Sequence, residues 1–197
     1  MNTAIIILAA GSSSRMGQSK QLLKIGDDSL LVRAIRVARK SGDHPTIVVL
    51  GAEEKKHRQE IGPLEVEVVS NPIWKNGIGG SLKAGLKHTS MKFPKTESVI
   101  IMVCDQPLVT ADHLKKIITK HEETHKPIIA SQYAGIAGVP ALFSNAIFQE
   151  IASLADDQGA KKIIQEHLSE TALVDFPQGA IDLDTPEEYR TFIKKSK

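Results

Sequence analysis

A run of apolar residues and then a loop of small residues make up Thr3-Ala4-Ile5-Ile6-Ile7-Leu8-Ala9-Ala10-Gly11-Ser12-Ser13-Ser14-Arg15-Met16-Gly17-Gln18-Ser19-Lys20. The run from Thr3 to Leu8 predicts a buried strand, because an uninterrupted series of β-branched and aliphatic residues suits the interior of a parallel sheet. In an open α/β sheet, ligands bind beyond the carboxyl ends of the strands, where this loop begins. Small residues let backbone N–H groups approach phosphate oxygens, and Arg15 and Lys20 add positive charge. The stretch therefore predicts an α/β protein with a phosphate-binding loop.

The glycine spacing of this loop differs from that of the common phosphate-binding motifs. Gly17 comes six residues after Gly11, and Lys20 lies three residues beyond Gly17. This spacing fits neither the dinucleotide fingerprint nor the P-loop. A flexible basic turn is the alternative interpretation, but two cations and two glycines in one loop after a strand favour anion binding.

The rest of the chain alternates between short apolar runs and amphipathic stretches, which is typical of βαβ units. Ser29, Thr110 and Thr185 are predicted N-caps of helices, and Thr185 forms a capping-box pattern with Glu188. We expect residues 1–197 to form one three-layer α/β/α domain around a mainly parallel sheet. Further strands are predicted at 46–50, 66–69, 99–103, 128–130 and 173–176, helices at 82–86, 145–154 and 158–168, and a loop at 70–77.

Composition limits the classes of function. The net charge of +2 is too small to suggest a protein that coats nucleic acid or an anionic membrane, and aromatic residues, at 4%, are too few for nucleic-acid stacking platforms. The longest apolar stretch, 4–10, is far shorter than the roughly 20 residues of a membrane span. The single cysteine, Cys104, excludes an internal disulfide and a cysteine-cluster metal site. We expect a cytoplasmic protein without a nucleic-acid or membrane partner.

Asp105 follows the apolar run 99–103, where a carboxylate is costly to bury unless it meets a cation. A magnesium ion at that position would neutralise charge on a leaving phosphate group. The alternative is that Asp105 caps a turn before Pro107. Asp182 and Asp184 alternate along an extended segment, so we expect only one of them on the side of Asp105.

Two further segments have candidate roles. Asn71 and the stretch 77–81 have the composition of a loop that reads a base, since glycines allow close approach and Asn71 and Ser81 offer donors and acceptors. The alternative is a simple loop with Ser81 as the cap of a helix. His121 and His125 match the H-E-x-x-H zinc motif, but Pro127 ends the helix, nearby lysines oppose a cation and no third ligand follows. We interpret the two histidines as a solvated helix end and Cys104 as a buried residue without a nucleophilic role.

Five motifs resemble those of one family, in order along nearly the whole chain. They are the loop from Leu8 to Lys20, Asn71-Pro72-Ile73-Trp74-Lys75-Asn76-Gly77-Ile78-Gly79-Gly80-Ser81-Leu82, Cys104-Asp105-Gln106-Pro107-Leu108-Val109-Thr110, Gly138-Val139-Pro140-Ala141-Leu142-Phe143, and Asp182-Leu183-Asp184-Thr185-Pro186-Glu187-Glu188-Tyr189. The family is that of molybdenum cofactor cytidylyltransferases and their guanylyltransferase relatives, MobA-like nucleotidyltransferases of the glycosyltransferase-A type. Ile78 departs from the methionine that is usual in the second motif.

The resemblance implies a nucleotide-diphospho-sugar transferase-like fold and Mg²⁺-dependent transfer of CMP from CTP to molybdopterin, the product passing to a molybdoenzyme. It implies CTP rather than GTP because Ala10 is the cytidylyltransferase residue at its position. It selects Asp184 as the second metal ligand beside Asp105, with helix capping as the alternative role of Asp184. The implied catalytic residues are Arg15, Lys20 and Asp105, and the implied nucleotide-binding residues are Leu8, Ala9, Ala10, Gly11, Arg15, Lys20, Asn71, Gly79, Gly80, Ser81 and Asp105.

Two other functions stay open at this point. The same fold transfers other nucleotidyl groups, either from GTP or to a sugar phosphate. A protein of another class, a non-catalytic carrier that delivers the molybdenum cofactor, would not need Asp105, Asp184 and Lys20 together.

Overall fold

The computed structural model describes residues 2–13 and 16–195. Its strands are β1 (Thr3–Ala9), β2 (Lys24–Ile25), β3 (Asp28–Ser29), β4 (Thr46–Leu50), β5 (Glu67–Ser70), β6 (Ser98–Val103), β7 (Ile128–Tyr133), β8 (Ile136–Ser144) and β9 (Thr171–Asp175). Its α-helices are α1 (Leu30–Lys40), α2 (Glu54–Ile61), α3 (Ile78–Lys92), α4 (Ala111–Thr124), α5 (Phe148–Ser153), α6 (Ala160–Glu166) and α7 (Pro186–Lys195). Short 3-10 turns include η2 (Lys20–Leu22) and η3 (Trp74–Asn76).

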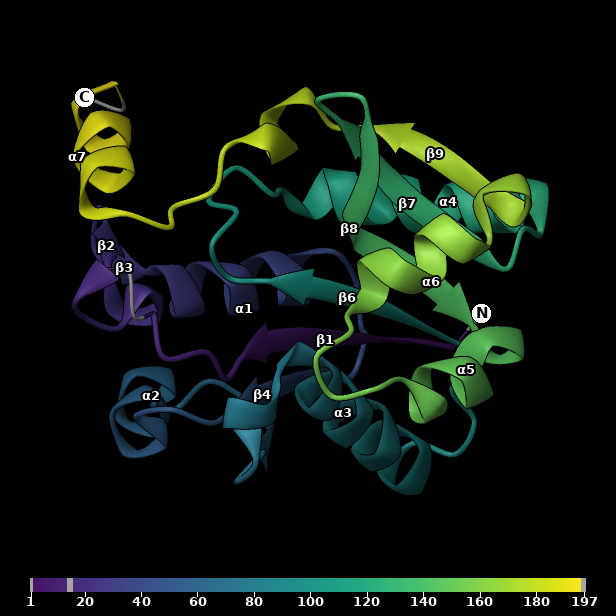
Figure 1. Cartoon of the computed structure of the whole chain (residues 1–197), viewed down its shortest axis with the longest axis horizontal. Coiled ribbons are helices and arrows are strands. Elements are labelled where there is room, and N and C mark those ends of the chain that lie inside the picture. The colour runs from purple at the N-terminus through teal and green to yellow at the C-terminus, as the bar shows by residue number, and fades with distance from the viewer. Residues whose placement is uncertain (1, 14–15, 196–197) are drawn as a thin grey trace.

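A seven-stranded sheet in the order β5-β4-β1-β6-β8-β7-β9 forms the centre of the molecule (Figure 1). Strands β5, β4, β1 and β6 pair in parallel, and β7 pairs in parallel with β9. Strand β8 runs antiparallel to both of its neighbours, β6 and β7. The carboxyl ends of β1, β6 and β7 therefore lie at one edge of the sheet, which is the left-hand side of Figure 1.

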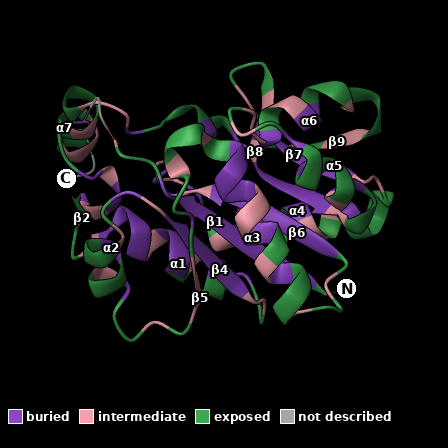
Figure 2. Ribbon diagram, turned by 60° about the horizontal axis from the view of Figure 1, so that its bottom comes forward, coloured by how far each residue is buried: buried purple, intermediate pink, exposed green. Residues whose placement is uncertain are grey.

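Helices cover both faces of the sheet, and its inner strands are buried between them (Figure 2). Alternate side chains of these inner strands therefore enter different cores. In β1, Ile6 belongs to the cluster on the α3, α5 and α6 side, whereas Ile5 and Ile7 belong to the cluster on the α1 and α4 side. All three isoleucines are 0% exposed. The three-layer α/β/α architecture with a mainly parallel sheet is thus confirmed, with β8 as its antiparallel strand.

A third, smaller apolar cluster anchors the C-terminal segment at the carboxyl edge of the sheet. Leu183 is 1% exposed and packs with Met16, Leu23 and Leu30, against which Tyr189 also lies. The Tyr189 hydroxyl donates a hydrogen bond of 2.7 Å to the carbonyl oxygen of Lys24 in the β2–β3 hairpin. The segment that carries Asp182 and Asp184 is therefore held beside the loop that follows β1.

The three predicted N-caps are confirmed. Ser29 Oγ accepts from the backbone N–H of Val32, and Thr110 Oγ1 accepts from that of His113. At α7, Thr185 and Glu188 exchange hydrogen bonds in a full capping box, the backbone N–H of Thr185 donating to Glu188 Oε2 at 2.8 Å. No helix among residues 2–13 and 16–195 is long and apolar enough to cross a membrane.

Two expectations were wrong. Residues 78–81 are the first turn of α3 rather than a loop, and the N-cap of that helix is Gly77, not Ser81. His121 is only 8% exposed, not solvated, because its Nδ1 bonds the carbonyl oxygen of Lys126 at 2.8 Å as the chain turns back at the end of α4. His125 follows in a left-handed conformation with φ of 52°, as the C-cap residue beyond α4.

Candidate active site

Gln21 fixes the shape of the loop after β1. Its side-chain amide donates hydrogen bonds to the carbonyl oxygens of Ala9 at 3.4 Å and Gly11 at 3.0 Å. Its Oε1 accepts from the hydroxyls of Ser13 at 3.0 Å and Ser19 at 2.8 Å. Gln21 is 1% exposed, so this single buried side chain ties the start of the loop to its end.

The same network continues into α2. His57 is 0% exposed, and its Nε2 donates to Ser19 Oγ at 2.7 Å, because the hydroxyl proton of Ser19 is already given to Gln21. Burial lowers the pKa of His57, which keeps the ring neutral. Neither Gln21 nor His57 was assigned a role from the sequence. The position of Gln21 directly after Lys20 was the available signal, whereas nothing local marks His57.

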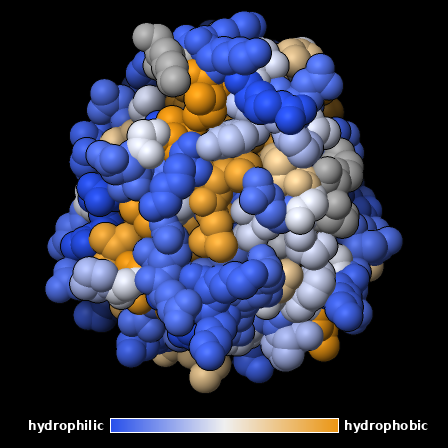
Figure 3. All heavy atoms as spheres, turned by 90° about the vertical axis from the view of Figure 1, so that its left-hand side faces the viewer, coloured by the Kyte–Doolittle hydropathy of each residue, from blue (hydrophilic) through white to orange (hydrophobic). Residues whose placement is uncertain are grey.

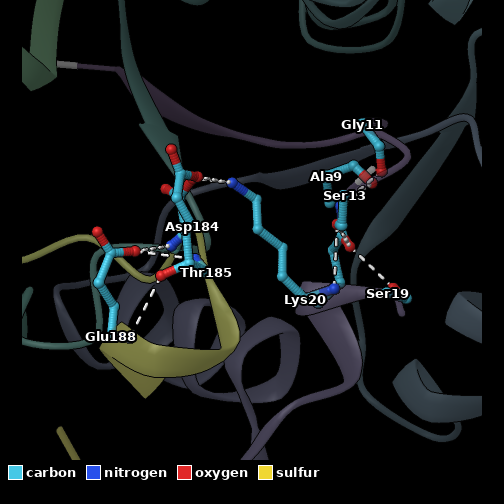
Figure 4. Close-up of polar contacts among 10 residues, drawn as sticks. Ala9, Gly11, Ser13, Ser19, Lys20, Asp184, Thr185 and Glu188 are labelled. Carbon is cyan, nitrogen blue, oxygen red and sulfur yellow. Dashed lines mark hydrogen bonds and ion pairs between the residues drawn. The ribbon is translucent and has the colours of Figure 1, made fainter. Parts of the chain in front are cut away.

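Lys20 extends from this loop to two carboxylates on other segments. Its Nζ pairs with Asp105 Oδ2 and lies 2.9 Å from Asp184 Oδ1 (Figure 4). The side chains of Lys20, Asp105 and Asp184 are 18%, 18% and 23% exposed. Burial disfavours the ammonium charge, but the two carboxylates outweigh that effect and raise the pKa of Lys20 above its usual value. The lysine is therefore a permanent cation at the centre of the site.

The backbone brings Asp184 to Asp105. The N–H of Leu183 donates to the carbonyl oxygen of Asp105 at 3.1 Å, which places the 182–184 segment beside the end of β6. The expectation that only one of Asp182 and Asp184 lies on the side of Asp105 is wrong, because residues two apart in an extended segment point to the same side. Asp184 meets Lys20, and Asp182 lines a cavity together with Asp105. Partial burial, with the charges of Asp184 and Asp105, raises the pKa of Asp182.

A cleft of about 350 Å³ opens beside Lys20 at the carboxyl edge of the sheet. Figure 3 looks onto this side of the molecule and shows apolar side chains in the middle of the face, framed by hydrophilic ones. Of the predicted site residues, the cleft is lined by Leu8, Ala10, Gly11, Lys20, Ser81 and Asp105. Gly77 and Ile78, from the stretch that was predicted to read a base, line it as well. Lining residues without a predicted role are Ser12, Gln21, Trp74, Lys75, Val103 and Cys104. Arg15 lies outside the described residues.

The other predicted nucleotide contacts have internal partners. Asn71 is 3% exposed, donates to Ser81 Oγ at 3.0 Å and accepts from the N–H of Ile73. It therefore links the first turn of α3 to the loop that precedes the helix. The N–H of Gly79 donates to the carbonyl oxygen of Asp156 at 2.8 Å. A Cβ on Gly79 would lie 2.3 Å from the carbonyl oxygen of Ala155, so this glycine allows two backbones to approach. Ala9 and Gly80 do not line the cleft either.

A second cavity, of about 380 Å³, lies on the other side of Asp105. It shares only Val103 and Asp105 with the first cleft. Gln106 contributes to its wall, is 8% exposed and has no hydrogen-bond partner for its Oε1 within the described part of the chain. The remaining lining residues are Tyr133, Ala134, Ile136, Val139, Gly179, Ala180 and Asp182. Two cavities therefore meet at one carboxylate.

Two other chemistries find no support in this geometry. Burial raises the pKa of Cys104 to about 12, so its thiol stays protonated and is a poor nucleophile. His121 is engaged with the backbone of Lys126, and His125 lies beyond the end of α4, so the pair does not form a zinc site. Among the described residues, no three His, Cys, Asp or Glu side chains gather as a metal-binding group.

The MobA-like NTP transferase domain matches residues 5–171. The chain belongs to this family. Purine catabolism protein PucB from Bacillus subtilis (strain 168) is 26% identical over 196 residues, covering 93% of this chain and 92% of PucB. Molybdenum cofactor cytidylyltransferase from Escherichia coli (strain K12) is 24% identical over 188 residues, covering 94% of this chain and 93% of that enzyme.

A solved structure, that of Rv0371c from Mycobacterium tuberculosis H37Rv in complex with manganese, has the same fold with a TM-score of 0.82 and 27% identity. The match covers 98% of this chain and 99% of that one. As a MobA-like NTP transferase, the protein is an enzyme that transfers nucleotidyl groups, which sets aside the non-catalytic carrier. Asp182 and Asp184 lie beyond the residues that match the family.

The role of Gln21 in this MobA-like NTP transferase is open to a direct test. Glutamate in its place keeps the shape of the side chain but donates nothing to the carbonyl oxygens of Ala9 and Gly11. We expect Gln21→Glu to lower the free energy of unfolding by about 1 to 3 kcal/mol, the usual cost of a buried polar group without a partner. Chemical denaturation measures this change, and Gln165→Glu on the exposed side of α6 is the matched control. Equal stability of the two variants would contradict the bracing role.

Proposed function

We propose that the protein transfers CMP from CTP to the phosphate of molybdopterin and releases pyrophosphate. The observation that carries the proposal is the meeting of two cavities at Asp105, with Lys20 between Asp105 and Asp184. A transferase needs a donor and an acceptor on opposite sides of the reacting phosphorus, and each cavity is of the size that small-molecule sites have, roughly 300 Å³ or more. The similarity to a molybdenum cofactor cytidylyltransferase supports this choice of substrates.

In this proposal the cleft that contains Ala10, Gly11 and Lys20 binds CTP. The loop after β1 supplies small residues and the cation of Lys20, and Arg15 adds a second charge. Trp74 and Ile78 offer apolar surface to the nucleoside at the opposite wall. Asn71 and Gly79 act indirectly, because their polar groups hold the start of α3 in place. Ser81 lines the cleft itself, and Gly80 lies beside it in the first turn.

The carboxylates fit a divalent metal ion. Asp105 and Asp184 converge on one position that is occupied by a positive charge, the Lys20 ammonium, and both offer the hard oxygen atoms that Mg²⁺ and Mn²⁺ prefer. Two carboxylates are too few for a complete coordination shell, so phosphate and water oxygens must supply the rest, as is usual for Mg²⁺. When bound, Mg²⁺ would neutralise negative charge on the leaving pyrophosphate.

The chemistry requires no nucleophilic side chain. A phosphate oxygen of the acceptor forms a bond to the α-phosphorus of CTP, and the bond from that phosphorus to the pyrophosphate oxygen breaks. Lys20 keeps its charge throughout and stabilises the extra negative charge on the phosphates. The protein contributes mainly by positioning two anionic substrates against each other.

The second cavity has groups suited to a polar ring system. Gln106 presents a buried oxygen atom that accepts no hydrogen bond from the described residues, and its amide is held by the carbonyl oxygen of Gly179 at 3.1 Å. Tyr133 and Asp182 add polar atoms to the same wall. Such a cavity favours an acceptor with N–H donors, and the pterin ring has them. The product would then pass to a molybdoenzyme.

The test is an assay of pyrophosphate release with each nucleoside triphosphate, with and without molybdopterin and Mg²⁺. We expect release only with CTP, metal and molybdopterin together. Release with a sugar phosphate in place of molybdopterin would assign the enzyme to another acceptor, and metal-dependent release with GTP alone among the nucleotides would overturn the cytidylyl assignment.

A finer prediction concerns the choice between CTP and GTP. Ala10 is 6% exposed and lines the cleft, so its methyl group narrows the space that a bicyclic purine would need. One methyl group is worth only about 1 to 3 kcal/mol, so we expect Ala10→Gly to weaken the preference for CTP without inverting it. The ratio of kcat/KM for CTP and GTP measures this effect, and the KM for molybdopterin, expected to stay constant, is the internal control. Equal kcat/KM values in the unmodified protein would contradict the prediction.

A further inference from the structure

We infer that Lys20 and the divalent metal ion compete for the same pair of carboxylates, so that metal binds weakly until a triphosphate draws the lysine away. The inference rests on the proposed function, in which Asp105 and Asp184 hold the metal. It adds that Lys20 has two positions in the reaction cycle, one between the carboxylates and one at the phosphates.

The carboxylates are fixed before any ligand arrives. Asp105 stands at the end of β6, where its carbonyl oxygen accepts from the N–H of Leu183. The backbone N–H of Asp184 donates to Glu188 Oε2 at 3.0 Å, within the capping box of α7 (Figure 4). The backbones of Asp105 and Asp184 are therefore both anchored, and the position between their carboxylates is preformed.

Lys20 has its backbone anchored in the loop network, whereas its side chain is held by the ion pairs with Asp105 and Asp184. Its N–H donates to Ser13 Oγ at 3.0 Å, and its neighbours Ser19 and Gln21 are buried in the loop network. The Lys20 side chain lines the cleft that we propose binds CTP, and its ammonium group ends at the carboxylates of Asp105 and Asp184. A rotation of this side chain alone thus moves the ammonium from the carboxylates to the cleft, with no change of the main chain.

Charge explains why the metal and the lysine exclude each other. Two carboxylates carry two negative charges, and the ammonium between them offsets part of that charge, so a free divalent ion meets a site that is already partly neutralised. A metal that bridges Asp105 and Asp184 needs the oxygen atoms that now face Lys20. A triphosphate offers the ammonium other anionic oxygens. Nucleotide and metal together therefore displace Lys20 from the carboxylates better than either does alone.

Mn²⁺ binding to the protein without nucleotide tests the competition. We expect Lys20→Met to tighten the Kd of Mn²⁺, measured from the electron paramagnetic resonance signal of the free ion, by about tenfold or more, as is typical of coupling between two ligands. Lys75→Met is the matched control: it removes the same charge from the same cleft, where Lys75 Nζ lies 5.6 Å from the Trp74 ring centroid and is exposed to solvent. Solvent and salt screen such a charge, so we expect a change of less than about threefold. An unchanged Kd in Lys20→Met, or equal effects of both variants, would overturn the inference.

A second measurement uses the unmodified protein, in case Lys20→Met does not fold. Acetylation of lysines by an amine-reactive ester, followed by mass spectrometry, gives a rate for Lys20 and, as an internal reference, for Lys75. We expect Lys20 to react slowly and to become several-fold faster when saturating Mg²⁺ displaces it from the carboxylates. A rate that stays constant or falls with saturating Mg²⁺ would mean that metal binds with the ion pair intact. Neither measurement depends on turnover, so the competition can fail while pyrophosphate release still supports the proposed function.

Discussion

Replacing Asp105 by asparagine should lower kcat/KM for nucleotidyl transfer by about 100-fold or more, the usual effect of removing a preorganised electrostatic group. Asparagine keeps the volume of the side chain but loses the charge that pairs with Lys20 and that we propose holds the metal. The fold should survive, because Asp105 is at the edge of the cleft rather than in either apolar core. Pyrophosphate release measures the activity, and circular dichroism checks the fold.

The matched control for this variant is Asp112→Asn. Asp112 lies in the first turn of α4 with its side chain 85% exposed, away from the cleft, and its replacement should leave activity unchanged. Asp184→Asn should be milder than Asp105→Asn, because Asp105 lines both cavities whereas Asp184 lines neither. If Asp105→Asn kept more than about a tenth of the wild-type turnover, the proposed role would be wrong.

Lys20→Ala should be the second severe change. The variant loses the cation that lines the CTP cleft and pairs with both carboxylates, so we expect a raised KM for CTP and a fall in kcat/KM of about 100-fold. Initial rates over a range of CTP concentrations separate the two effects. Lys87→Ala, on the exposed side of α3, is the control.

The histidine variants give an independent comparison with Lys20→Ala. His125→Ala should leave the activity unchanged, and His121→Ala should cost stability through its lost bond to Lys126 while it keeps kcat. Loss of kcat in both histidine variants, together with bound zinc in the unmodified protein, would move the active site to α4.

Much of the architecture could be predicted because local patterns determined it. The isoleucines at 5–7 favour a strand, whichever face of the sheet each one packs on. Ser29, Thr110 and Thr185 cap helices through contacts with residues only three positions away. The start of α3 could not be predicted, because glycines at 79 and 80 disfavour a helix locally. There, contact with the 155–158 segment decides the structure, and no local pattern reports such a contact.

Part of the candidate site could likewise be predicted from the sequence, and part could not. Lys20 and Asp105 follow strands whose carboxyl ends meet at one edge of the sheet, so their proximity could be expected from the order of strands. Their direct pairing could not, since 85 positions separate them and its geometry depends on how the loop is folded. His57 was not predicted because α2 is highly charged. Only the packed structure shows that His57 faces inward to Ser19, on the same helix as the buried Ile61.

The antiparallel strand β8 divides the sheet into two parts with separate tasks in the proposed reaction. Residues up to Asp105 build most of the wall that faces the nucleotide, and the residues after it, through the β7–β8 hairpin and the 179–182 segment, build the wall that faces the acceptor. In the proposed reaction, we therefore expect a substitution in the hairpin to change the acceptor while the donor stays the same. On this plan the two walls change independently of each other, because they share only Val103 and Asp105.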